Sequence, residues 1–255
     1  MSKSSDSPDG LLTNIYKDIL SPTMQEYGKA LALLPRAVNA ALQPIDLYLH
    51  TKEVNHEEIK KLVIEKASKK SPDDIVPPDP YVAVPAMQAL SYSIDSDALR
   101  NAYANLLSAS IDKNMKDYVH PSFVEALKQL SPIDVKVFDS VLKHKLCVIV
   151  DLVSYASYDG IYPKSQYILE TNISGLEISN HLMQGAAFNL LSRLGFIEIQ
   201  NTAITDDSCY APIYASNEYR DLLQKHSERP NLAPIRKHFI ITDLGELFGQ
   251  VCFDS

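Results

Sequence analysis

The chain has 255 residues, 45% of them hydrophobic, which is enough for one large or two ordinary domains with a real core. Its 24 basic and 32 acidic residues give a formal net charge of −8, which argues against binding a phosphate backbone through an excess of Lys and Arg. Eight glycines leave little room for Gly-rich phosphate loops, and three distant cysteines without a CxxC pair indicate reduced thiols.

The first residues predict neither a targeting segment nor a folded element. Residues 1–10 are mostly Ser, Asp, Lys and Pro, which predicts a disordered tail rather than a signal peptide. No run of about 18 apolar residues is present in the sequence, so no membrane-spanning helix is expected. These features and the unpaired cysteines predict a cytoplasmic protein.

Residues 24–50 carry apolar side chains at helical spacing. Pro35 and Pro44 interrupt the pattern, which predicts kinked or separate helices rather than one rod. Packing of this apolar face inside a helical bundle is the favoured interpretation. A membrane-surface helix is the alternative, and the lack of a polar face rich in Lys and Arg argues against it.

Further helical patterns follow in the first half of the chain. A charged helix is predicted over residues 56–70, and four prolines make residues 71–80 a loop. Apolar residues then recur at helical spacing over 83–94 and again over 97–111. Together these segments predict an irregular helical domain over residues 11–130.

The stretch over residues 120–132 ends this helical half. Pro121 suits the first turn of a helix, where its missing N–H is not needed. Phe123, Leu127 and Leu130 fall on one face of that helix. Because the helix is short and runs into the next one without a glycine, we expect this face to be buried at a structural joint between two halves.

The next helix begins with a recognisable cap. Ser131 is predicted as the N-cap, Pro132 as the first helical residue, and Asp134 as a first-turn carboxylate. Residues 146–153 are apolar and β-branched, which fits either a buried strand or the continuation of that helix. Residues 155–171 are predicted as a long connection with scattered tyrosines.

The last part of the chain predicts a helix followed by short alternating elements. Helical spacing runs from Glu177 to Leu194 and ends at Gly195, a residue type favoured just after a helix. The predicted elements that follow are strand 196–200, polar loop 201–215, helix 218–225, strand 238–241, and helix 243–252 with Thr242 as its cap.

This order of elements, with the segments RLGFIE and ITDLGELF, resembles a winged-helix domain. The resemblance implies a winged-helix-like domain with a small antiparallel sheet over residues 131–255, and a mainly α (α+β) protein as a whole. Its recognition-helix surface would carry Asn180, His181, Gln184 and Arg193. That surface has one formal positive charge and the wing is acidic, so nucleic acid is disfavoured as a partner.

No catalytic or metal-binding motif is present in the sequence. It contains no P-loop, HExxH or GxSxG string, and its seven histidines show no metal-ligand spacing. Asp112, His120 and Glu125 form a candidate polar cluster that offers an acid and a base. Such residues more often cap helices and tie loops, so we predict a protein that is not an enzyme and holds no metal or cofactor.

Several longer segments resemble the Abi-alpha family, a bacterial family associated with abortive infection of phage. They are IYKDILSPTMQEYGKAL, PDPYVAVPAMQALSY, LRNAYANLLSASIDK, VHPSFVEALKQLSPIDV, LLSRLGFIEI and LGELFGQVC, and they span residues 15–252. The resemblance implies a role in anti-phage defence. It supplies no catalytic residues, because the matching positions read as helix caps, helix faces and a hinge.

Three functions follow as hypotheses. The first is a defence protein that acts by binding a host or phage protein rather than by catalysis. The second is a membrane-disrupting effector that uses residues 24–50, and the third is a DNA-binding regulator that uses the winged-helix-like part. A homo-oligomer is compatible with each of them.

Overall fold

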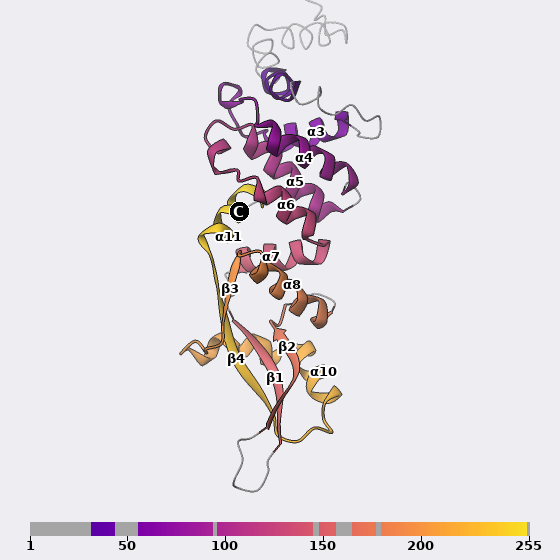
Figure 1. Ribbon diagram of the computed structural model, residues 1–255, viewed down its shortest axis with the longest axis vertical. Coiled ribbons are helices and arrows are strands. Elements are labelled where there is room, and N and C mark those ends of the chain that lie inside the picture. The colour runs from indigo at the N-terminus through magenta and orange to yellow at the C-terminus, as the bar shows by residue number, and fades with distance from the viewer. Residues whose placement is uncertain are drawn as a thin grey trace, which may run out of the picture.

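The computed structural model describes residues 32–43, 56–93, 96–144, 148–156, 165–176 and 180–253. They form an elongated molecule with helices at one end and a small antiparallel sheet at the other (Figure 1). The predicted class, mainly helical with mixed α+β content, is confirmed. The predicted tail over residues 1–10 and both ends of the 24–50 segment lie outside the described residues.

The helices of the first half pack around one central helix, α5. Residues 32–43 are helical and bury Val38, Ala41 and Leu42 in the main core, so this part of the apolar segment packs against protein. Helix α5 packs against α3, α4, α6 and α7. The elements are α3 (His56–Lys66), η1 (Pro72–Asp74), α4 (Pro80–Tyr92), α5 (Asp97–Ser110), η2 (Lys116–Tyr118), α6 (Ser122–Gln129) and α7 (Pro132–His144).

Capping side chains set several of the helix boundaries. The Ser131 N–H donates to Asp134 Oδ2 at 2.6 Å, and the Asp134 N–H donates back to Ser131 Oγ at 3.3 Å. This reciprocal pair satisfies donors that the first turn leaves without an intrahelical partner. Thr242 Oγ1 accepts from the Gly245 N–H at 3.0 Å, and Gly195 has a φ of +79° just after its helix. The predicted boundaries at these positions are confirmed.

The second half contains a four-stranded antiparallel sheet in the order β2-β1-β4-β3. The strands are β1 (Val148–Ala156), β2 (Ser165–Ile173), β3 (Ile197–Gln200) and β4 (Leu232–Ile241). The ambiguous segment 146–153 therefore belongs mainly to a strand. The prediction of a connection over 155–171 is wrong, because its second part pairs with β1 as the edge strand β2. A register irregularity near Leu152 breaks the alternation by which sequence patterns reveal strands.

The helices of this half are α8 (His181–Arg193), η3 (Asp207–Tyr210), α9 (Ala211–Ala215), α10 (Asn217–Lys225) and α11 (Asp243–Cys252). The predicted loop over 201–215 is corrected, since η3 and α9 lie within it. The two strands predicted as a wing do pair, with Ile197 opposite Ile241. Because β1 and β2 extend the sheet and helices fill the connection between β3 and β4, the winged-helix interpretation stays a prediction.

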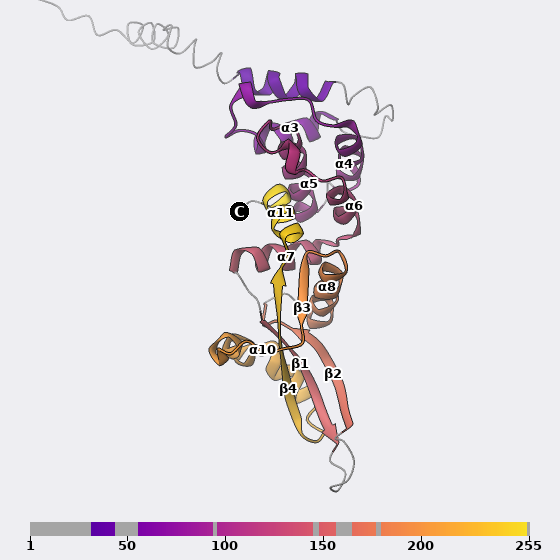
Figure 2. The same ribbon diagram turned by 60° about the vertical axis from the view of Figure 1, so that its left-hand side comes forward.

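The last helix, α11, returns to the first half and packs against α5 (Figure 2). Asn105 Nδ2 of α5 donates to the Cys252 carbonyl oxygen at 3.1 Å. The Phe248 ring stacks on Phe196 at a centroid distance of 4.1 Å and meets Phe123 of α6 at 5.3 Å. One continuous core therefore joins the helices of the first half to α8, β3 and α11.

The three residues of the expected joint are all buried, at 0% exposure for Phe123, 1% for Leu127 and 5% for Leu130. Phe123 lies directly against α11 through its contact with Phe248. Any variant that opens this contact therefore affects helices from both halves of the chain.

Candidate functional site

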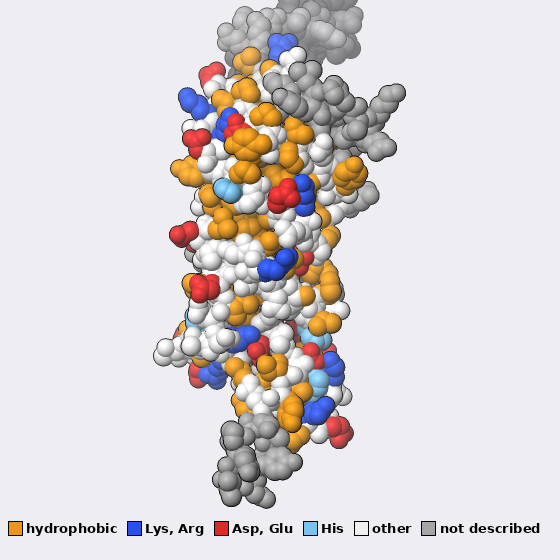
Figure 3. Space-filling view, in the orientation of Figure 1, with side chains coloured by type: hydrophobic (Ala, Val, Ile, Leu, Met, Phe, Trp, Pro, Cys, Tyr) orange, Lys and Arg blue, Asp and Glu red, His pale blue; other side chains and the backbone are white. Residues whose placement is uncertain are grey.

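A cleft of about 930 Å³ lies between the start of α8 and the helices α9 and α10. Its walls come from the connection after β2, the first residues of α8, the end of α9 and the first two turns of α10. Figure 3 shows histidine side chains among acidic and basic ones in the lower part of the molecule, and acidic and basic side chains scattered between hydrophobic ones over the helical half. The cleft is larger than three other hollows among the described residues, which have volumes of about 150, 360 and 230 Å³.

Local caps and one close backbone approach hold the walls of the cleft. Asn180 Oδ1 accepts from the N–H of Leu182 at 3.0 Å and so caps α8. Ser216 Oγ accepts from the Tyr219 N–H at 3.1 Å and caps α10. Gly175 has a φ of +71°, and a Cβ added there would lie 3.0 Å from the Ile213 Cα, so no larger residue fits without strain.

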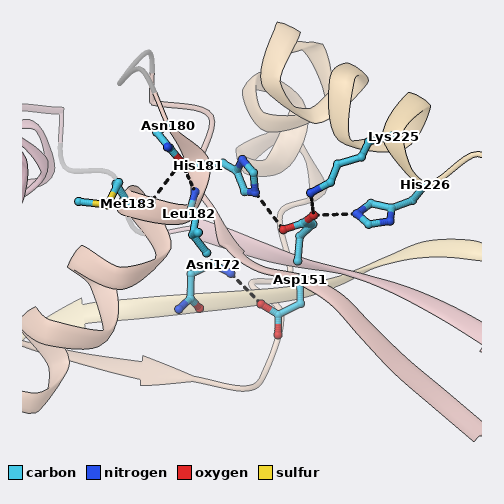
Figure 4. Close-up of polar contacts among 9 residues, drawn as sticks. Asp151, Asn172, Asn180, His181, Leu182, Met183, Lys225 and His226 are labelled. Atoms are coloured by element: carbon cyan, nitrogen blue, oxygen red, sulfur yellow. Dashed lines mark hydrogen bonds and ion pairs between the residues drawn. The ribbon is translucent and has the colours of Figure 1, made fainter.

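Glu170 ties the strand β2 to both helices beside the cleft. Its carboxylate receives His181 Nε2 at 2.9 Å, Lys225 Nζ at 2.6 Å and His226 Nε2 at 2.7 Å. Figure 4 shows these three side chains converging from the start of α8 and the end of α10. The Glu170 side chain is only 9% exposed, whereas that of Lys225 is 56% exposed.

The Glu170 contacts change the acidity of its carboxyl group. Burial acts to raise the pKa, but the hydrogen bonds from Lys225, His226 and His181 outweigh burial and lower it to about 2, from an ordinary value of 4.5. A carboxylate with such a low pKa and three donors is a poor general base. Its role in this arrangement is to fix His181 and α10 in place.

This depressed pKa predicts an acid-dependent loss of stability. The stabilisation is present above pH about 4.5 and is lost as the pH falls toward about 2, because the unfolded chain takes up the proton first. We expect Glu170→Gln to lower the free energy of unfolding at pH 7. We also expect this variant to lose less of its free energy of unfolding than the parent loses as the pH falls from about 4.5 to about 2. Urea titrations at a series of pH values measure this, with the exposed Glu198→Gln as the matched control. If the free energy of unfolding depended on pH equally in Glu170→Gln and in the parent, the stabilising role of the Glu170 carboxylate would be contradicted.

A second carboxylate, Glu218, lies in the wall of the cleft. Both of its oxygens are buried without a hydrogen bond of good geometry, although the Gln184 amide lies near enough to affect its ionisation. Burial raises the pKa of Glu218, and His181 and Gln184 only partly oppose that rise. Asp221 also lines the cleft, three residues further along α10, and it is exposed.

A buried polar network supports the strand beneath α8. Lys237 Nζ lies 2.9 Å from Asp151 Oδ1 and donates to Asn172 Oδ1 at 2.8 Å. Asn172, which has a left-handed φ of 54°, donates its backbone N–H to Asp151 at 2.9 Å. Its side-chain amide donates to Asn189 Oδ1 of α8 at 2.9 Å. The network therefore links β4, β1 and β2 to the helix that forms one wall of the cleft.

The three residues of the polar cluster predicted from the sequence each contact a different partner. Asp112 forms an ion pair with Lys70 and accepts from the Asn114 N–H at 2.8 Å. His120 Nδ1 lies 2.7 Å from Ser122 Oγ at the start of α6, and Glu125 pairs with Lys128 at 2.8 Å. His120 therefore contacts the start of a helix and Glu125 belongs to a surface pair, whereas the buried Asp112 is paired with a lysine 42 residues earlier in the chain.

The predicted recognition-helix surface is mostly engaged within the protein. His181 contacts Glu170, Asn180 caps the helix, and Gln184 is 1% exposed and donates to the Leu176 carbonyl oxygen at 2.8 Å. Arg193 donates to Gln129 Oε1 of α6 at 3.1 Å. Gln184 therefore lies inside the protein rather than on a recognition surface, whereas Asn180 and Arg193 are exposed.

Sequence reasoning missed the residues that make this site. Glu170 lies on β2, whereas Glu218, Lys225 and His226 belong to α10 and its C-cap, up to 56 residues further along the chain, and no local motif connects them. Within the described ranges, no group of three or more His, Cys, Asp or Glu side chains is arranged to hold a metal ion. In the same ranges no helix has the length and apolar character needed to cross a bilayer.

Comparison with known proteins gives one match. A family model described as abortive infection alpha matches residues 51–252, which is most of the chain. The match includes the helices from α3 to α11 and the whole sheet. No curated protein and no solved structure matches the chain.

Proposed function

Because the chain belongs to the abortive infection alpha family, we propose that it is an anti-phage defence protein that acts by binding another protein rather than by catalysis. Family membership implies the role in abortive infection, and the binding mechanism is the step that we add. The observation that carries it is the open cleft beside α8, α9 and α10, which is large enough to receive side chains of a partner. We further propose that the protein acts in the cytoplasm on a host or phage protein.

The chemistry of the cleft favours binding over turnover. Ser216, the hydroxyl residue in its wall, accepts from the Tyr219 N–H and donates to the Ile213 carbonyl oxygen at 2.7 Å, so it serves as a cap. His181 is held by Glu170 and has no contact with that hydroxyl among the hydrogen bonds of the described residues. A nucleophile paired with a base, which covalent catalysis needs, is therefore not formed by these side chains.

The charge in the cleft favours a protein over a nucleic acid as the partner. Glu218 and Asp221 both line it, and no Lys or Arg is present among the described residues of its wall. A phosphate backbone would be repelled by this surface. Exposed apolar side chains lie beside the cleft, with Leu182 at 68% and Met183 at 40%, and such residues are common in protein interfaces.

Blocking the cleft tests this proposal. Ala215 is exposed and lines the cleft at the end of α9, so Ala215→Trp should fill part of it without disturbing the core. We expect this variant to melt like the parent and to lose phage protection by about tenfold or more in plating efficiency, since loss of a central contact often costs over 1 kcal/mol. The matched control is Ala203→Trp, an exposed alanine outside the cleft.

Two outcomes would contradict this proposal. Full protection by a well-folded Ala215→Trp variant would show that the cleft is not used. Turnover of NAD or nucleic acid by the purified protein, abolished by His181→Ala, would show that the protein is an enzyme.

A further inference from the structure

The two edges of the sheet differ in how well they are protected against pairing with another strand. Natural proteins protect edge strands by keeping them short or by placing charges or proline on them. Strand β3 has only four residues, and its Glu198 is exposed. Strand β2, at the opposite edge (Figure 1), has nine residues, and residues 165–169 include no charged residue and no proline. The β2 edge therefore lacks the protection that β3 has.

The hydrogen bonds of β1 show which backbone groups of β2 turn outward. Tyr155 of β1 donates its N–H to the Asn231 carbonyl oxygen at 3.3 Å, and its own carbonyl oxygen accepts from Asn231 Nδ2 at 3.1 Å. Both backbone groups of Tyr155 therefore point away from β2. Gln166 lies opposite Tyr155, and Ile168 follows two residues later in the same register. Because the two kinds of pair alternate in an antiparallel ladder, both residues turn their N–H and C=O groups to the outer side of β2.

These outward groups are open to another strand. Within the described part of the chain, no hydrogen bond occupies the outward N–H and C=O groups of Gln166 and Ile168. Further along β2 the edge is covered by α8, since a Cβ added to Gly185 would lie 2.9 Å from the Thr171 carbonyl oxygen. The open part of the edge therefore ends before Thr171.

Apolar side chains surround this open edge. Tyr167 and Ile168 are each 57% exposed, and Leu182 at the start of α8 is 68% exposed. Ile168 and Leu182 both line a hollow of about 230 Å³ beside β2 and α8. Exposed apolar surface next to unpaired backbone groups is the combination that an added β-strand covers.

The open edge is complementary to a second copy of itself. A two-fold axis at Tyr167 sets Gln166 of each copy opposite Ile168 of the other, in pairs that each exchange two N–H···O=C hydrogen bonds. The two Tyr167 side chains then lie directly across the axis, where cross-strand aromatic pairs are favourable. Like charges do not oppose this approach along β2, because its one charged residue, Glu170, is already paired with Lys225.

We propose that two copies of this chain pair antiparallel through the β2 edge, with Tyr167 on the two-fold axis, and so join their sheets into one. This inference goes beyond the proposed function and does not depend on it. The paired stretch is short, so the contact is smaller than the roughly 800 Å² per partner of a standard interface. We therefore expect a dimer with a dissociation constant in the micromolar range.

Charges introduced at the axis test both the pairing and its register. Tyr167→Lys and Tyr167→Glu each place like charges directly opposite one another, so each should weaken self-association by about tenfold or more. An equimolar mixture of the two variants should associate again, because opposite charges then meet across the axis. The matched control is Tyr92→Lys, which changes an exposed tyrosine of α4 and should associate like the parent. Sedimentation velocity of the full chain from about 1 to about 100 µM measures each sample.

Hydrogen exchange reports the backbone pairing itself. The N–H groups of Gln166 and Ile168 face solvent in a monomer, and their exchange should slow by about tenfold or more as the protein concentration rises and the dimer forms. Gln166→Pro removes an outward donor without removing a β1–β2 hydrogen bond. It should therefore weaken the dimer and melt like the parent, which provides a second test if the Tyr167 variants fold poorly.

Three results would overturn the inference. The first is a parent protein that stays monomeric up to about 100 µM. The second is a dimer that neither Tyr167→Lys nor Gln166→Pro weakens, or whose Lys and Glu variants fail to associate when mixed. The third is a monomeric parent whose phage protection is lost in Tyr167→Lys, which would assign the β2 edge to a strand of another protein instead of a second copy.

Discussion

Phe123→Ala is expected to lower the free energy of unfolding by about 3–5 kcal/mol, as truncation of a fully buried Phe usually does. The Phe123 side chain is 0% exposed, and its ring meets the Phe248 ring at 5.3 Å. Phe248 in turn contacts Phe138, Phe196 and Phe253, so the cavity would open at the centre of an aromatic cluster. A loss of this size is a large share of the stability of an ordinary domain.

Chemical denaturation at neutral pH measures this effect. Tyr92→Ala provides the matched control, because Tyr92 is an aromatic residue of α4 with 83% exposure and should change stability by less than about 0.5 kcal/mol. Phe123→Leu should fall between the two, since it removes less volume. Equal midpoints for the parent and Phe123→Ala would show that the α6–α11 contact does not hold the two halves together.

Local signals account for the parts of the fold that the sequence predicted well. Ser131 with Asp134, Thr242 and Gly195 each mark a boundary through chemistry within a few residues, and such chemistry is visible in sequence. The burial of Phe123 followed from its place on one apolar face of a short helix. Pro85 lies inside α4, which continues through it, although a proline usually interrupts a helix.

Elements that depend on distant partners were harder to predict. Strand β2 lies at the edge of the sheet, and its alternation is interrupted near Asn172, so its pattern resembles a connection. Helix α9 has only five residues, too few for helical periodicity to appear. Both gain their structure from tertiary packing rather than from local preference.

The candidate site shows the same limit more strongly. Glu170 and His226 are 56 residues apart, and they meet only because β2 and the end of α10 lie side by side. A sequence pattern gives no measure of this proximity, and neither residue belongs to a known motif. His181 was singled out from the sequence, yet for a recognition surface rather than for its contact with Glu170.

The network under α8 predicts the second large effect on stability. Lys237 is 8% exposed and Asp151 is 7% exposed, so Lys237→Met would leave a buried carboxylate without its counter-ion. Removing one partner of a buried ion pair typically costs about 3–5 kcal/mol, because the remaining charge stays desolvated. The change would also remove the donor to Asn172 Oδ1, which helps hold a left-handed residue in place.

A second substitution separates the charge from the packing. The double variant Asp151→Asn/Lys237→Met has neither charge. The amide oxygen introduced at position 151 can still accept a hydrogen bond from the Asn172 N–H. We therefore expect the double variant to recover most of the stability that Lys237→Met loses, as measured by urea unfolding. Because Asn172 also donates to Asn189 of α8, Lys237→Met should loosen the wall of the cleft and weaken phage protection, and the double variant should restore it. A double variant no more stable than Lys237→Met would show that the Lys237 contacts matter through packing rather than charge.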